Sequence, residues 1–166
     1  MITDLIISHL KSFANAHLTF INIHKKLYRD YKKYHKKCTS KNHIASKWLR
    51  EKQKDYYTHK LYKKYHCFIS LRAHINENTT FPHPIGIIIG DGAKIGKNCT
   101  IYQNVTIGRR NPKNPEDIAI IGDNVLIGCN SIILGNIHIG NNAKIAAGSI
   151  VLRDVKPNET VHGVVK

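Results

Sequence analysis

The chain has 166 residues, 42% of them hydrophobic, so it is long enough to bury a core and too apolar to be a disordered protein. The formal net charge is +15, and residues 25–66 hold 15 Lys/Arg against 3 Asp/Glu, a net of +12. No apolar stretch approaches the roughly 18 residues of a membrane span, and the N-terminus lacks the basic start of a signal peptide. The four cysteines form no CxxC pair, which favours free thiols in a reducing cytoplasm.

The first part of the chain carries helical patterns. Residues 3–21 place apolar side chains on one stripe, and residues 25–37 and 44–66 continue with helical spacing among many lysines. We expect the tyrosines and Trp48 of this part to pack against the fold rather than to stack on nucleic-acid bases. Residues 1–66 are therefore predicted to form a basic α-helical N-terminal region.

From Cys67 onward, isoleucine or valine recurs every sixth residue. The fourth residue after each is small or branched, and a glycine often follows directly. This period fits neither an α-helix nor a long alternating strand, but it is typical of a β-solenoid built from short flat strands. We therefore expect residues 67–166 to form a parallel β-helix of about five three-sided coils. The repeated positions are Ile89, Ile95, Ile101, Ile107, Ile121, Ile127, Ile133, Ile139, Ile145 and Val151.

The repeat falters at two places. Pro82 and Pro84 flank His83, which predicts a fixed bend. The step from Ile107 to Ile121 is fourteen residues, two more than two hexads. Residues 109–119 are therefore predicted to form a polar loop that projects from the solenoid. Loops on a rigid repeat scaffold are common places for function.

The repeat resembles that of the hexapeptide-repeat acyltransferases, which are left-handed parallel β-helices. It is most similar to the serine acetyltransferase branch, over a stretch of about 85 residues that contains three matching segments. These segments are PHPIGIIIGDGAKIGKNCTIYQNVTIG (82–108), IGDNVLIGCNSIILGNIHIGNNAKIAAGSIVLRDVKP (121–157) and VHGVV (161–165).

The resemblance implies that His83 is a general base for acetyl transfer from acetyl-CoA, with no metal. An imidazole has a pKa near working pH and takes the proton of an attacking hydroxyl. Glu77, a backbone carbonyl or a residue of a neighbouring subunit are open alternatives for the group that orients this imidazole. The resemblance also implies a coenzyme A groove between neighbouring solenoids, lined by Gly108, Arg109, Cys129, Ser131, Ala146, Ala147 and Arg153.

The chain departs from the serine acetyltransferase pattern in three features. Phe68 replaces a carboxylate that pairs with the base, Pro82 replaces an acidic residue, and Asp117 and Ile118 stand where an Arg-His pair is expected. We therefore expect the acceptor to be a hydroxyl of a sugar or of a cell-surface polysaccharide, such as capsule or O-antigen. In this hypothesis the basic region attracts an anionic glycan or the anionic inner membrane, and the enzyme is cytoplasmic or peripheral at that membrane.

Other functions stay open at this stage. Serine O-acetylation is the main alternative, and it differs from the first hypothesis only in its acceptor. A zinc hydratase on the same fold needs clustered histidines, but His74, His83 and His138 have no recognisable ligand spacing. A scaffold or nucleic-acid binder would rest on the basic helices alone, and we expect no specific nucleic acid. The resemblance implies a homotrimer that covers the flat apolar sides of so short a solenoid.

Overall fold

The structure is a computed structural model and describes residues 26–38 and 47–166. Residues 26–38 are helical, and helix α2 spans Lys47–Tyr65, as two of the expected helical segments predicted. The helix expected over residues 3–21 lies outside the described residues, and so does the side chain of Trp48. None of the helices in the described part is both long and apolar enough to cross a membrane.

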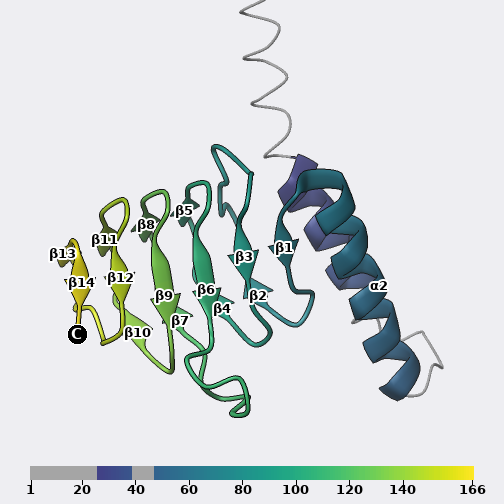
Figure 1. Ribbon diagram of the computed structural model, residues 1–166. Helices are drawn as coiled ribbons and strands as arrows, with labels where there is room; N and C mark the ends of the chain where they lie inside the picture. The colour runs from purple at the N-terminus through teal and green to yellow at the C-terminus, as the bar shows by residue number, and fades with distance from the viewer. Residues whose placement is uncertain (1–25, 39–46) are drawn as a thin grey trace, which may run out of the picture.

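The two helices pack against the first coil of a solenoid (Figure 1). The Tyr31 hydroxyl donates a hydrogen bond of 2.7 Å to the Ala73 carbonyl, and the Leu71 amide donates one of 3.2 Å to the Thr58 hydroxyl. The helices therefore cover the N-terminal end of the solenoid core. The prediction that tyrosines pack against the fold is confirmed for Tyr31, Tyr34 and Tyr65, whereas Tyr56 and Tyr62 are exposed. Buried helical side chains are Leu27, Tyr31, Tyr34, Cys38, Thr58, Leu61 and Tyr65.

The solenoid is built from very short parallel strands, mostly two residues long, which in the described part form one six-stranded and two four-stranded sheets. The six-stranded face has the order β1-β3-β6-β9-β12-β14, and the others have the orders β10-β7-β4-β2 and β13-β11-β8-β5. The strands are β1 (Phe68–Ile69), β2 (His74–Ile75), β3 (Ile88–Ile89), β4 (Lys94–Ile95), β5 (Thr100–Ile101), β6 (Thr106–Gly108), β7 (Ile120–Ile121), β8 (Leu126–Ile127), β9 (Ile132–Leu134), β10 (His138–Ile139), β11 (Lys144–Ile145), β12 (Ile150–Val151), β13 (Thr160–Val161) and β14 (Val164–Val165).

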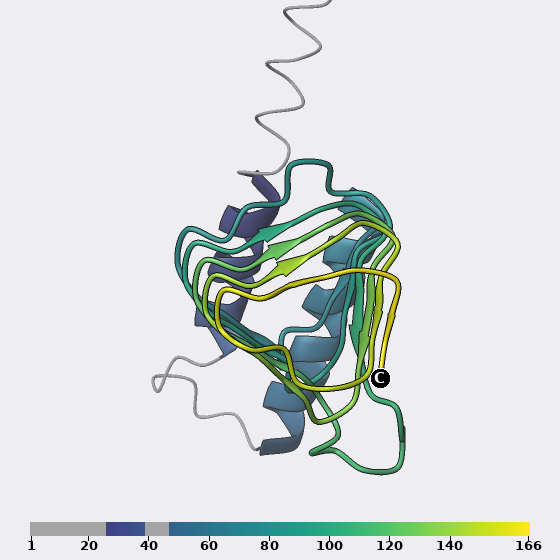
Figure 2. The ribbon, with the colours of Figure 1, turned by 90° about the vertical axis from the view of Figure 1, so that its left-hand side faces the viewer.

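The second residue of each strand points into the core, and this is the residue that recurs every sixth position. Ile89 pairs with Ile107, and Ile107 pairs with Ile133, so isoleucines stack directly above one another in successive coils. These side chains have 0% exposure. Viewed from the C-terminal end, the chain runs clockwise as it advances toward the viewer, so the β-helix is left-handed, as the resemblance implied (Figure 2).

The strand register corrects the prediction for the long step. Ile107 lies on the six-stranded face and Ile121 on the next face, where it pairs with Ile95. One hexad separates neighbouring faces, so the fourteen residues are one hexad plus eight inserted residues, not two hexads plus two. Residues 109–119 connect β6 to β7 and project from one corner of the triangular cross-section (Figure 2). We call this corner, between the six-stranded face and the β10-β7-β4-β2 face, the loop corner.

The bend at Pro82 and Pro84 lies at a different corner, between the β13-β11-β8-β5 face and the six-stranded face. Thr80 bridges to Thr100, and Ile88 then pairs with Thr106. We call it the His83 corner. The turns at this corner require left-handed backbone, which asparagine and glycine adopt at low cost. Residues with positive φ in this column are His66, Gly86, Asn104, Asn130, Gly148 and Gly163.

Candidate active site

His83 stands on the bend at the His83 corner and its side chain is exposed. Phe81, two residues earlier, is fully buried and anchors the bend to the core. After it, the Ile85 amide donates a hydrogen bond of 2.8 Å to the His83 carbonyl, which closes a tight turn. The anchor on one side and the closed turn on the other hold the backbone of the bend in place, and the exposed imidazole of His83 is open to a hydroxyl substrate.

Tyr102 and Gln103 lie on the next coil beside this bend. The rings of His83 and Tyr102 have centroids 6.1 Å apart and are tilted by 47°. The Gln103 side-chain oxygen is buried without a hydrogen-bond partner among the described residues. Neither residue was among the predicted site residues. Both belong to the segment YQNVTIG, in which only Gly108 was predicted to contact coenzyme A.

Three of the predicted coenzyme A contacts continue the same corner. The Asn130 amide donates to the Gln103 carbonyl at 3.0 Å, and the Gly148 amide donates to the Cys129 carbonyl at 2.8 Å. These bonds place Cys129 one coil beyond Gln103, and Ala146 and Ala147 one coil further. Their small, partly or fully exposed side chains leave room for a ligand along the corner.

Close packing of the coils shapes this part of the corner. A Cβ atom on Gly128 would lie 2.5 Å from the Ala147 nitrogen, so only glycine fits there. Ser131 is buried, and its hydroxyl donates to the Ala146 carbonyl at 3.0 Å. Its side chain therefore holds the turn of Ala146 and is turned away from the surface.

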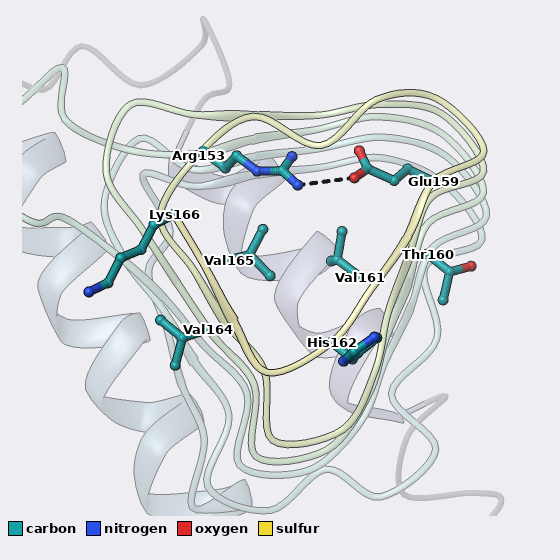
Figure 3. A pocket seen from close by; sticks show the side chains of 8 residues that line it. All are labelled: Arg153, Glu159, Thr160, Val161, His162, Val164, Val165 and Lys166. Atoms are coloured by element: carbon teal, nitrogen blue, oxygen red, sulfur yellow. Dashed lines mark hydrogen bonds and ion pairs between the residues drawn. The ribbon is translucent and has the colours of Figure 1, made fainter.

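The other predicted contacts lie at the loop corner, across the six-stranded face. Gly108 ends β6, and the Arg109 guanidinium donates to the Asp91 carbonyl at 3.1 Å, while its Nε is buried without a partner among the described residues. Arg153 forms an ion pair of 3.1 Å with Glu159 at the open end of the solenoid (Figure 3). One copy of the chain therefore divides the predicted coenzyme A contacts between two corners.

The inserted loop is held in place by its own side chains. Asp117 accepts hydrogen bonds from the backbone amides of Asn111 and Asn136, and these amides lower the pKa of its carboxyl. Ile118 is 7% exposed. The two residues at the expected Arg-His positions therefore stabilise the loop, and neither presents a cation to a substrate.

The departure at Phe68 leaves an apolar surface on the six-stranded face. Phe68 is 43% exposed on the outward side of β1, and Ile88 beside it is 44% exposed. Glu77, one of the groups considered for orienting the base, forms an ion pair of 3.0 Å with Lys97 at the third corner. In the described part of the chain, no group of three His, Cys, Asp or Glu side chains is arranged to hold a metal ion.

Comparison with known proteins supports the family resemblance. Residues 83–110 match the hexapeptide repeat of succinyl-transferase, and residues 118–153 match the bacterial transferase hexapeptide (six repeats). The chain is similar to the serine acetyltransferase of Synechococcus elongatus, with 39% identity over 92 residues, which are 55% of this chain and 38% of the relative. It is 44% identical over 92 residues to the Staphylococcus epidermidis serine acetyltransferase, covering 55% of this chain and 43% of that protein.

Solved structures show the same similarity. Soybean serine acetyltransferase without ligand has a TM-score of 0.65 and 36% identity, over 69% of this chain and 49% of its own. A serine acetyltransferase in complex with CoA has a TM-score of 0.68 and 27% identity, over 82% of this chain and 53% of its own. The chain spans about two fifths of the length of the curated relatives named here.

These relatives overturn the predicted acceptor. We expected a sugar or polysaccharide hydroxyl because three serine-recognising features are altered, but the matched proteins and structures are serine acetyltransferases. The prediction was wrong because it gave these three departures more weight than a similarity that extends over 92 residues. The hexapeptide repeats, the left-handed β-helix and these relatives together support the similarity of the chain to the hexapeptide-repeat acyltransferases.

Proposed function

We propose that the protein transfers the acetyl group of acetyl-CoA to the hydroxyl of serine. The observation that supports this most strongly is the position of His83. It is exposed on a bend at the start of a corner lined by small residues, within residues 83–110, which match a hexapeptide-repeat family model, in a chain similar to serine acetyltransferases. The proposed activity fits a place in the cytoplasm, where acetyl-CoA is available and the four free cysteines would stay reduced.

In this reaction the His83 imidazole takes the proton of the serine hydroxyl as the oxygen attacks the thioester carbon. The new C–O bond forms, a backbone amide stabilises the oxyanion, and the C–S bond then breaks. The imidazolium returns its proton to the coenzyme A thiolate, so atoms and charges balance. Cys129, Ala146 and Ala147 would border the pantetheine arm, because their side chains are small and follow His83 along one corner.

We further propose that three copies assemble through their six-stranded faces. The outward side chains Phe68, Ile88 and Val164 are apolar and 43%, 44% and 60% exposed, which favours contact with another copy. Assembly would bring the loop corner of one copy beside the His83 corner of the next. Arg109 and Arg153 would then reach the coenzyme A phosphates from the neighbouring copy. Light scattering at micromolar concentration should give a trimer mass, and a monomer mass would contradict this assembly.

The acceptor is tested by measuring thiol release from acetyl-CoA with L-serine, with ethanolamine and with no acceptor. Ethanolamine carries the same hydroxyl and amine but lacks the carboxylate. We expect L-serine to accelerate thiol release and O-acetylserine to be the product by mass spectrometry. Equal thiol release with and without L-serine would refute the proposed acceptor.

A further inference from the structure

Arg72 is the centre of an ion-pair network between helix α2 and the solenoid. Its guanidinium donates to Glu51 at 2.6 Å and to Asp55 at 2.8 Å, and both carboxylates belong to α2. The same guanidinium lies 3.6 Å from the Asp91 carboxylate, which belongs to the turn after β3. A planar guanidinium with several donors suits such a junction, because it can bind more than one carboxylate at a time.

The backbone of Arg72 contacts the same turn. The Gly92 amide donates to the Arg72 carbonyl at 3.3 Å, and the Ser70 hydroxyl donates to the Asp91 carboxylate while accepting from the Arg72 amide at 3.0 Å. The turn of residues 90–92 is therefore held to the first coil by side-chain and main-chain contacts together.

This turn supports both ends of the inserted loop 109–119. At the first end, Arg109 donates to the Asp91 carbonyl at 3.1 Å. At the other end, Ile118 lies over the turn, since a Cβ atom on Gly92 would be 3.4 Å from its Cγ2. A displacement of the turn would therefore move both attachments of the loop at once.

We propose that Arg72 is a positioning residue: through the turn 90–92 it sets the place of Arg109 and of the inserted loop relative to helix α2. The helices thus contribute to coenzyme A binding without touching it. The part of this inference that concerns coenzyme A rests on the proposed function, whereas the part that concerns the loop does not.

The test uses the full chain with Arg72→Met, Arg72→Lys and Lys97→Met. Lysine keeps the positive charge but loses the fork that reaches two helix carboxylates. Lys97→Met is the matched control, because it removes another ion pair of the solenoid, the one with Glu77 at the third corner. Hydrogen–deuterium exchange of loop 109–119 and calorimetric titration with coenzyme A are measured for each variant.

We expect Arg72→Met to speed exchange in the loop and to weaken coenzyme A binding by about 2- to 30-fold, the range for substitutions that act through another residue. Arg72→Lys should restore part of both effects, and Lys97→Met should change neither. Unchanged loop exchange in Arg72→Met would overturn the proposal. Faster exchange spread over the whole solenoid would overturn it too, since that result indicates general destabilisation.

The two proposals fail separately. If the unaltered protein binds no coenzyme A, the proposed function is refuted, and the exchange of the loop alone decides the role of Arg72. If the protein binds coenzyme A and Arg72→Met binds it equally well, the proposed function stands and the effect of Arg72 on the ligand is refuted.

Discussion

Gly128→Ala should lower the affinity for coenzyme A at the proposed groove in addition to its cost in stability. A Cβ atom at this position would lie 2.5 Å from the Ala147 nitrogen and 2.8 Å from its Cα, against 3.4 Å for ordinary contact. The backbone that carries Ala146 and Ala147 must therefore shift. Overpacking of this kind costs about 1–3 kcal/mol, and we expect the upper end because the obstacle is backbone and not a flexible side chain.

Gly140→Ala is the matched control for this substitution. A Cβ atom at Gly140 would lie 2.3 Å from the Pro157 nitrogen, which is an equally severe clash at the third corner, away from His83. A loss of about 3 kcal/mol in the free energy of unfolding should lower the melting temperature of both variants by about 6–12 °C, the shift typical of domains of this size. Differential scanning calorimetry measures this loss, and titration with coenzyme A measures affinity.

Only Gly128→Ala should also lose affinity for coenzyme A, because only its clash displaces residues of the predicted groove. Equal affinities in the two variants would refute the placement of the ligand along the His83 corner. Unchanged melting temperatures of both variants would refute the close packing of the coils at Gly128 and Gly140.

Three further predictions concern the fold. Ile107→Ala removes a fully buried side chain from the isoleucine stack and should cost about 2–5 kcal/mol in urea unfolding; a cost below 1 kcal/mol would contradict the stack. Asn130 has φ +58°, so Asn130→Gly should retain more stability than Asn130→Ala in thermal melts, and the reverse order would contradict the left-handed turn. Hydrogen bonds from Lys54 and Arg72 lower the pKa of the Glu51 carboxyl below its ordinary 4.5, so its contribution to the free energy of unfolding is complete above that pH and is lost as the pH falls. Glu51→Gln should therefore flatten the decline of stability between about pH 5 and 3, and an unchanged slope would contradict the pairing.

The strands could be predicted because one physical requirement repeats along the chain. Each strand buries its second residue, so the six-residue period marks positions such as Ile127 and Ile145 directly. The turns carry a second pattern in the sequence. Asparagine recurs just before the small inward residue, as in Asn98 and Asn124, and the structure shows these asparagines in left-handed turns with an amide hydrogen bond of 3.2 Å between them.

The length of the inserted segment could not be counted from the sequence. Counting hexads from Ile107 to Ile121 does not reveal on which face the next strand resumes, whereas the pairing of Ile121 with Ile95 does. The division of the predicted coenzyme A contacts between two corners is likewise a matter of register. The support of the loop by Arg72 depends on contacts between residues far apart in the chain, which no local pattern records.

The central claim, His83-dependent acetyl transfer, is tested most directly by the rate of thiol release from acetyl-CoA with L-serine in the unaltered protein, His83→Ala and His138→Ala. His138 is an exposed histidine on the β10-β7-β4-β2 face and serves as the control. We predict that His83→Ala loses at least about 100-fold in rate, as removal of a general base does, and that His138→Ala keeps the full rate. A near-normal rate in His83→Ala would contradict the account.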